Sequence, residues 1–490
     1  MNPADPRPPA EIDPIARLDG LAQAELVRRG ELTPLELVDA AITRAEKLDP
    51  VLHAVVLPAF ERAREQAAAG PPAGPFRGVP FLMKDIGGEE AGLPCWQGMR
   101  VLRDAGLREP RDSYFTERCR AAGLVSLGRT NTPELALLPT TEPEAFGATR
   151  NPWDPERMPG GSSGGAAAAV ASGMVPLAHA SDGGGSIRIP AALCGLVGLK
   201  PTRGRCSFGP GRGERWSGFS CELVVSRSVR DTAAFLDAAA GRMPGDPYTA
   251  PPPERPFLDA VRGGAGRLRI GLLAEPFREG LEVDPECFEA ARIAARALEE
   301  LGHRVEPAWP EALADGSIMG SYITVVACNV ARALEAVGSR LGRVLGPDDV
   351  EPLTWAIAER GRATPVTDFL AALEGVHALG RRLEAWWAEG FDLLLSPATA
   401  RPAAPLGEIR STREEPFAAF ARAAPYGAFT APFNQSGQPA ISVPVHWTAS
   451  GLPVGAQLVA EQGREDLLLA VAAELERALP WADRWPPVHA

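Results

Sequence analysis

The feature that most constrains this chain is a stretch rich in glycine, serine and alanine between residues 160 and 190, GGSSGGAAAAVASGMVPLAHASDGGGSIRIP. It holds two clusters of glycine and serine, GGSSGG at 160–165 and DGGGS at 182–186, with small residues between them. Glycine costs conformational entropy wherever a fold fixes it. Two such clusters therefore indicate that the backbone follows an unusual path at both places.

Three interpretations of the clusters compete. Glycine loops before helices bind phosphate, but neither GxxxxGK[ST] nor a GxGxxG fingerprint is present here. The loops could simply be tight turns. Alternatively, DGGGS could present Ser186 as a nucleophile together with adjacent backbone N–H groups that stabilise an oxyanion. The G-x-S-x-G elbow of the α/β-hydrolases is absent, which argues against that type of triad.

Composition narrows the class of protein. The chain has 490 residues, a net charge of −12 and a pI near 5.2, which argues against a general nucleic-acid-binding role. Seven cysteines without a CxxC pair indicate reduced thiols, no zinc site and a cytoplasmic location. The N-terminus lacks the pattern of a signal peptide, and no apolar run is long enough to span a bilayer.

Strand and helix patterns alternate along the chain, which predicts an α/β fold with a largely parallel sheet. Strands are expected on both sides of the Pro/Gly-rich connection 242–256, so one sheet is favoured over two domains. Residues 317–390 are predicted to be mostly helical, and AISVPVHWTASGLPVGAQLVA reads as a terminal hairpin. Thr33 followed by Glu36 predicts a capping box at a helix start.

Lysine is scarce: only Lys47, Lys84 and Lys200 occur among 50 basic residues. Lysine can lose its proton when buried, whereas arginine effectively cannot. Lys84 ends the apolar segment GVPFLMK, where desolvation would favour the neutral amine that a general base requires. The equally weighted alternative is a structural ion pair between Lys84 and Asp85.

A serine nucleophile could instead use histidine as its base. None of the six histidines lies in a recognisable triad motif. His179 is the only one predicted to lie near the glycine clusters, at the end of a strand. We favour a packing role for it over a catalytic one.

Several separate motifs together resemble the amidase signature family. They are FRGVPFLMKD, GRTNTPE, GATRNPW, GGSSGG, SDGGGSIRIPAALCGLVGLKPTRGR and NQSGQPAISVP with GLPVGAQLVA, spread from about residue 20 to 478. TTEPEAFGATRNPW and REDLLLAVAAELERALPW resemble, more closely still, a subgroup that includes 6-aminohexanoate-cyclic-dimer hydrolases.

The resemblance implies an α/β fold with a large twisted mixed sheet covered by helices on both faces. It implies one amidase domain over residues 1–490, with the catalytic core at about 60–230 and a helical substrate-pocket region at about 310–390. It also implies a Ser–cis-Ser–Lys triad, in which Lys84 is the base, Ser162 the proton bridge and Ser186 the nucleophile. The cis peptide would join Gly161 to Ser162.

The family's oxyanion donors correspond to the backbone of Gly183, Gly184, Gly185 and Ser186. This sequence has glycine at 183, where the family usually has threonine or a similar residue, and Arg129 where lysine is common. Asp182 and Arg188 resemble residues that support this loop, although both could also be ordinary charges at a sheet edge.

The implied reaction is hydrolysis of a small-molecule amide, linear or cyclic, without metal or cofactor. Carbamate or ester hydrolysis and ammonia production within a glutamine amidotransferase complex remain alternatives, and a homodimer remains open. We expect no nucleic-acid or membrane partner. The substrate pocket is expected to involve Trp216, Phe219, Tyr322 and Cys328, for each of which core packing is an equal alternative.

Overall fold

A computed structural model describes residues 12–490 of the chain. Its eleven strands form a single sheet in the order β1-β3-β2-β4-β6-β5-β10-β11-β9-β7-β8. The sheet includes strands from both sides of the 242–256 connection. The strands are β1 Val55–Pro58, β2 Pro80–Lys84, β3 Val125–Thr130, β4 Leu177–Asp182, β5 Val197–Lys200, β6 Cys221–Ser226, β7 Arg269–Leu272, β8 Arg304–Pro307, β9 Leu393–Pro397, β10 Ala440–Trp447 and β11 Pro453–Val459.

The sheet is mixed, so the expectation of a largely parallel sheet was wrong. Strands β3, β2 and β4 run parallel to one another, as do β8, β7 and β9. Between these two groups, β6, β5, β10 and β11 pair antiparallel. The short β10–β11 connection can only join antiparallel neighbours, and β6 lies between β4 and β5 and runs antiparallel to both. The mixed sheet implied by the family resemblance is confirmed.

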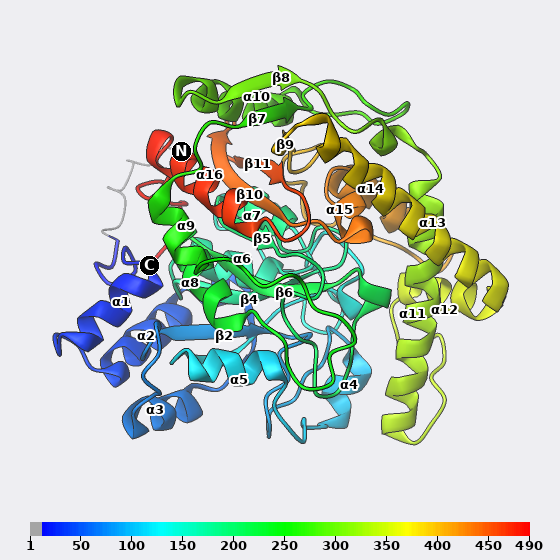
Figure 1. Cartoon of the computed structure of the whole chain (residues 1–490). Coiled ribbons are helices and arrows are strands. Elements are labelled where there is room, and N and C mark those ends of the chain that lie inside the picture. Colours follow the sequence, from blue (N-terminus) through cyan, green and yellow to red (C-terminus); the bar gives the residue numbers. More distant parts are fainter. Residues whose placement is uncertain (1–11) are drawn as a thin grey trace, which may run out of the picture.

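Helices cover both faces of the sheet (Figure 1). The helices are α1 Gly20–Arg28, α2 Pro34–Leu52, α3 Phe60–Ala69, α4 Arg100–Ala105, α5 Tyr114–Ala121, α6 Gly164–Ala171, α7 Arg188–Cys194, α8 Val229–Ala239, α9 Phe257–Gly263, α10 Pro285–Glu300, α11 Ile318–Leu341, α12 Pro352–Ala363, α13 Val366–Ala385, α14 Ala418–Gly427, α15 Ala431–Ser436 and α16 Glu465–Ala478. The predicted capping box is present, because Thr33 and Glu36 bond each other's backbone N–H. No helix among residues 12–490 has the length and apolarity needed to cross a membrane.

The small residues after the first cluster form most of α6. All eight of its residues are buried, and it contacts β4, β2, β6 and α7. A Cβ on Gly165 would lie 2.5 Å from the backbone nitrogen of Asn131. The first cluster is therefore rich in glycine partly because the helix backbone must approach the end of β3 closely.

The region 317–390 is helical, as expected. Helix α11 packs against α12 and α13, and these three helices form an extension at one edge of the molecule (Figure 1). Most of their buried apolar side chains belong to a separate apolar cluster that also contains Ile189 of α7 and Phe219. This cluster joins the helical extension to the second glycine cluster.

The packing of α6 generates a prediction about stability. Gly165→Ala should lower the free energy of unfolding by more than about 2 kcal/mol, because the new methyl group meets fixed backbone atoms. Gly320→Ala in α11 is the matched control: nothing lies within 4 Å of its Cβ position, and alanine favours helix by about 1 kcal/mol. Denaturant unfolding of both variants measures the difference. A Gly165→Ala protein as stable as the parent would contradict this account of the helix.

Candidate active site

Lys84 lies at the end of β2 with its amine fully buried. Its Nζ lies 2.7 Å from Ser162 Oγ, 2.9 Å from Ser163 Oγ and 3.0 Å from Ser181 Oγ. The carboxylate of Asp85 points elsewhere and accepts the backbone N–H groups of Trp96 and Gly98. The alternative of a Lys84–Asp85 ion pair is therefore wrong.

The surroundings of the Lys84 amine favour its neutral form. Burial lowers the pKa of Lys84 to about 7, although the charges of Asp182 and Glu222 partly oppose this shift. The three hydroxyl oxygens that surround Nζ bring no compensating charge. At neutral pH a substantial fraction of this lysine is thus able to accept a proton.

The first glycine cluster positions Ser162 against this amine. The peptide bond between Gly161 and Ser162 is cis, as the family resemblance implies. A Cβ on Gly161 would lie 2.5 Å from the carbonyl oxygen of Thr140, so only glycine fits there. The Thr132 hydroxyl donates to the carbonyl of Ser162 over 2.9 Å and fixes the other side of the loop.

The second cluster carries Ser186 between the end of β4 and the start of α7. Gly185 has a φ of +134°, a conformation that favours glycine. The carbonyl groups of the loop are held from outside: Tyr322 donates to Gly183 over 3.1 Å and Thr430 to Gly184 over 2.7 Å. A Cβ on Gly183 would lie 2.9 Å from the Trp216 ring, so glycine at this position makes room for that indole.

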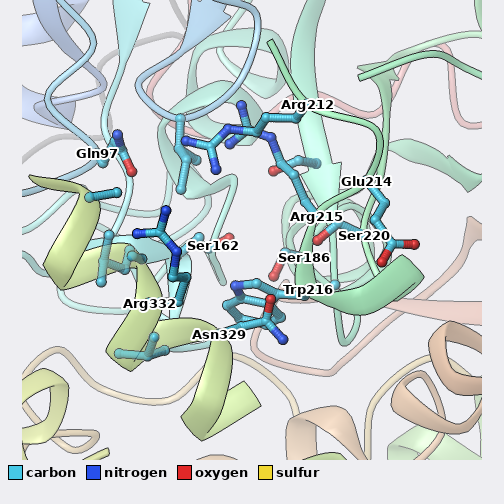
Figure 2. A pocket seen from close by; sticks show the side chains of 18 of the residues that line it. Gln97, Ser162, Ser186, Arg212, Glu214, Arg215, Trp216, Ser220, Asn329 and Arg332 are labelled. Atoms are coloured by element: carbon cyan, nitrogen blue, oxygen red, sulfur yellow. The ribbon is translucent and has the colours of Figure 1, made fainter. Parts of the chain in front are cut away.

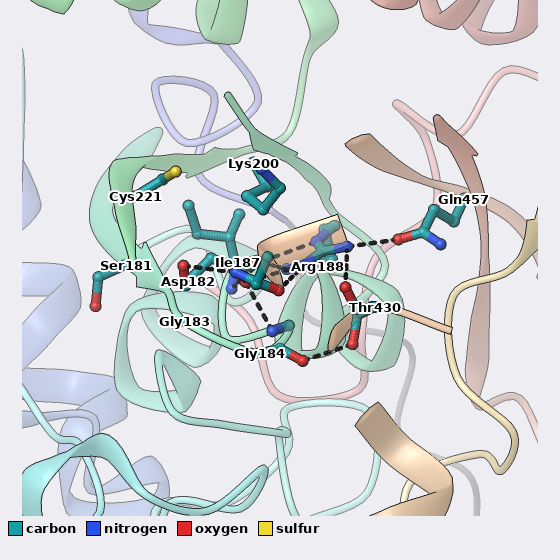
Figure 3. Close-up of polar contacts among 12 residues, drawn as sticks. Ser181, Asp182, Gly183, Gly184, Ile187, Arg188, Lys200, Cys221, Thr430 and Gln457 are labelled. Atoms are coloured by element: carbon teal, nitrogen blue, oxygen red, sulfur yellow. Dashed lines mark hydrogen bonds and ion pairs between the residues drawn. The ribbon is translucent and has the colours of Figure 1, made fainter. Parts of the chain in front are cut away.

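A buried ion pair anchors the same loop (Figure 3). Arg188 Nε lies 2.9 Å from Asp182 Oδ2, and Arg188 also donates to Gln457 of β11 over 2.8 Å. Asp182 further accepts from Asn434 of α15 and from the backbone N–H of Gly185. Burial alone would raise the pKa of Asp182, but the guanidinium of Arg188 holds it well below its usual range. The expected supporting role of Asp182 and Arg188 is confirmed.

His179 of β4 lies behind the lysine. Its Nδ1 accepts the backbone N–H of Lys84 over 3.2 Å, and its ring packs against Phe115. Burial holds the pKa of His179 well below its ordinary value, so the ring is neutral. The remaining proton is therefore on Nε2, which lies 3.9 Å from the buried carboxylate of Glu222. These contacts match the favoured packing role.

Two cavities meet at Ser186. The polar cavity, of about 240 Å³, is lined among others by Ser162, Ser186, Arg212, Glu222, Asn329 and Arg332 (Figure 2). The apolar cavity, of about 480 Å³, is lined among others by Leu138, Ser186, Ile189, Tyr322, Ile323 and Phe420. Trp216 lines both cavities.

Of the four expected pocket residues, the structure places two on the cavity walls. Trp216 and Tyr322 line cavities, whereas Phe219 is buried and its ring stacks on Tyr322 at 5.4 Å between centroids. Cys328 lines neither cavity, and its Sγ approaches the carbonyl of Gly361 on α12 at 3.9 Å. The polar-cavity face of α11 begins at the next residue, Asn329, so the expectation for Cys328 was wrong by one position.

Sequence reasoning missed two further parts of the wall. Leu135 and Ala136 line the polar cavity from a turn in which both residues have positive φ. Arg212 and Arg332 also line it, from the loop before Trp216 and from α11. The spacing of polar residues along α11 could have indicated Arg332, but no local pattern marks the other positions.

Comparisons with known proteins agree with this geometry. A family model described as Amidase matches residues 36–469. A 6-aminohexanoate-cyclic-dimer hydrolase of Pseudomonas sp. (strain NK87) is 44% identical over 475 residues, which cover 96% of each chain.

Solved structures show the same similarity. The structure of a 6-aminohexanoate cyclic dimer hydrolase complexed with substrate has a TM-score of 0.94 at 44% identity, covering 97% of this chain and 100% of that one. A bacterial aryl acylamidase of the amidase signature family has a TM-score of 0.86 at 29% identity, covering 96% and 98%. The chain therefore belongs to the amidase family of hydrolases that act on C–N bonds, and it has the amidase signature fold.

Proposed function

We propose that this enzyme hydrolyses a carboxylic amide through an acyl-enzyme on Ser186, with Lys84 as the general base and Ser162 as the proton bridge. The observation that carries the proposal is the 2.7 Å contact between the buried Lys84 amine and Ser162, which lines the same cavity as Ser186. A lysine with a pKa of about 7 can act as a base at neutral pH, because much of it is unprotonated.

The reaction begins when neutral Lys84 accepts the Ser162 hydroxyl proton while Ser162 accepts the proton of Ser186. The Ser186 oxygen attacks the amide carbonyl, and the carbonyl oxygen becomes an oxyanion. Transfer of a proton to the nitrogen through Ser162 then allows the C–N bond to break, because the nitrogen leaves as a neutral amine and not as a strongly basic anion. Water attacks the acyl-enzyme by the same proton route and releases the carboxylic acid.

The loop at 183–186 supplies the groups that stabilise the oxyanion. The N–H of Gly185 already donates to Asp182 over 2.7 Å, so the expectation that Gly185 is an oxyanion donor was wrong, and this N–H holds the loop instead. The N–H groups of Gly183, Gly184 and Ser186 are the remaining donors in this loop. Each donor of this kind contributes about 10²–10³ in rate.

The substrate is a small amide, linear or cyclic. Similarity to hydrolases of a cyclic amide dimer supports this choice over the amidotransferase alternative, since the glutamyl-tRNA(Gln) amidotransferase chain of Thermotoga maritima is only 26% identical. Carbamates and esters could enter the same acyl chemistry. A screen of amides, cyclic amides, carbamates and esters with the isolated chain distinguishes these possibilities.

The assignment of the nucleophile gives the first test. Ser186→Ala should lower kcat by more than about 10³-fold and abolish the acyl adduct seen by intact mass spectrometry. Ser220→Ala, which changes another serine on the wall of the polar cavity, should retain activity and adduct. Near-normal turnover by a folded Ser186→Ala protein would remove Ser186 from the mechanism.

The role of Lys84 predicts a different pattern. Lys84→Arg keeps a positive charge but cannot accept a proton, so kcat should fall by about 10²–10⁴-fold. The control is Lys200→Arg, because Lys200 is also buried but donates only to the carbonyl of Pro201 and lines neither cavity. Its kcat should stay within a few-fold of the parent. A Lys84→Arg enzyme with more than about a tenth of the parent kcat would contradict the proposal.

The carboxyl group of Glu222 allows the role of Lys84 to be tested through the pH dependence of activity. Activity should rise as pH increases through about 7, because only neutral Lys84 accepts a proton. Ionised Glu222 raises the pKa of Lys84, and burial raises the pKa of Glu222 itself to about 7, so Glu222→Gln should move the acid limb of kcat/KM to lower pH. Glu214→Gln, in the same cavity but bonded to Tyr248, should leave the limb unchanged. A limb that moves to higher pH in Glu222→Gln would contradict the sign of this coupling.

A further inference from the structure

Helix α11 spans both cavities and gives each a different character. Its first turns place Met319, Tyr322 and Ile323 on the apolar cavity. Its later turns place Asn329 and Arg332 on the polar cavity. Within each of the two sets the residues lie three or four positions apart and share a face of the helix, and the two cavities that they line meet at Ser186. An amide held at Ser186 therefore extends one half into the apolar cavity and the other half into the polar cavity.

The position of Ser162 decides which half enters which cavity. Ser162 lines the polar cavity and is absent from the wall of the apolar one. In the proposed function, Ser162 returns a proton to the departing nitrogen, which must lie within hydrogen-bond reach of its hydroxyl. The amine half of the substrate thus occupies the polar cavity, and the acyl half occupies the apolar cavity.

The protein neutralises some, but not all, of the arginines that line the polar cavity. Arg215 pairs with Glu89, and Arg340 pairs with Glu109 at 3.1 Å. Arg212 has no ion-pair partner among residues 12–490. Figure 2 shows Arg212 and Arg332 reaching into the cavity, from the loop and from α11 respectively.

The carboxylates nearby compensate the charge of this pair of arginines only in part, since Glu89 and Glu109 favour charged Arg212 but are themselves paired with Arg215 and Arg340. Arg332 has only an exposed contact at 4.0 Å to Glu335, and such surface pairs contribute little. Repulsion from Arg215, more than burial, lowers the pKa of Arg212. Of the two carboxylates on the cavity wall, Glu214 accepts the Tyr248 hydroxyl at 2.7 Å and Glu222 is buried beside Lys84. An anion bound between Arg212 and Arg332 would relieve the repulsion.

The apolar cavity limits what the acyl half can carry. Its charged lining residues are Arg278 and Arg360, and no carboxylate of the described chain lines it. An ammonium group on the acyl half would lose its hydration there without gaining a partner. The acyl half is accordingly a largely apolar group without an ammonium.

We propose that Arg212 and Arg332 form a subsite for a carboxylate on the amine half of the substrate. The preferred substrates are then N-acyl amino acids, in which an apolar acyl group is joined to an amine that bears a carboxylate. This inference rests on the proposed amidohydrolase function and extends it to a substrate class. Arginine suits the task because its planar fork binds a carboxylate through two parallel hydrogen bonds.

The test compares two amides that differ only in the charged group, N-hexanoyl-aminobutanoate and N-hexanoyl-aminobutanol. The parent enzyme should show a kcat/KM at least about tenfold higher for the acid, as expected for charge-assisted hydrogen bonds to a ligand. Arg212→Gln and Arg332→Gln should each remove most of this preference, mainly through a higher KM for the acid. With the neutral amide, which has no carboxylate to bind, the same variants should lose far less kcat/KM than with the acid.

Arg360→Gln is the matched control, since it removes an arginine from the apolar cavity. It should leave the preference for the acid unchanged. Loss of the preference in Arg360→Gln, with retention in Arg212→Gln and Arg332→Gln, would assign the carboxylate to the other cavity and overturn the proposal. Equal or better hydrolysis of the neutral amide by the parent enzyme would also overturn it, while leaving the amidohydrolase function intact.

A parent enzyme that hydrolyses neither amide would overturn the subsite as well. The proposed function is then judged separately, by acylation with an activated hexanoyl ester followed by mass spectrometry. An adduct on Ser186 would preserve the acyl-enzyme chemistry. The absence of any adduct would contradict that chemistry too.

Discussion

The burial of one lysine amine, with hydroxyl oxygens as its nearest partners, is the constraint on which the site depends. An ammonium removed from water loses hydration energy that neutral hydroxyl groups replace only in part. The protein resolves this conflict by favouring the neutral amine, and the pKa of Lys84 falls to about 7. Desolvation would make a charged, purely structural lysine unfavourable at this position. Here it favours the neutral amine, which is the base that acyl transfer requires.

This amine can act as a base only if both glycine–serine clusters lie close to it. Two different kinds of interaction hold the two clusters in place. The first cluster is held by close packing, because the Cβ positions of Gly161 and Gly165 are filled by neighbouring backbone. The second is held by charge, through the buried pair of Asp182 and Arg188 that connects β4 to α15 and β11. Packing and electrostatics thus fix Ser162 and Ser186 independently, the first just before α6 and the second just before α7.

The sequence was most informative where local rules decide the structure. The capping box at Thr33 and the helical region that contains residues 318–341 both depend on neighbours in the chain. It was less informative where distant segments meet. Antiparallel pairing of β6 and β10 depends on which strands become neighbours, which periodicity does not reveal. The expectation for Cys328 was wrong because the sequence pattern places a helix residue only to within about one position. A shift of one position is enough to turn a side chain from the cavity to α12.

The scarcity of lysine allows a direct measurement of the central claim. Nitrogen-15 labelling of lysine followed by NMR titration yields signals from only Lys47, Lys84 and Lys200, and a Lys84→Met variant identifies the relevant one. The account predicts that the Lys84 amine changes protonation near pH 7, with the neutral form present above it. A Lys84 amine that remains protonated to about pH 10, as in an exposed lysine, would contradict a neutral base and the mechanism built on it.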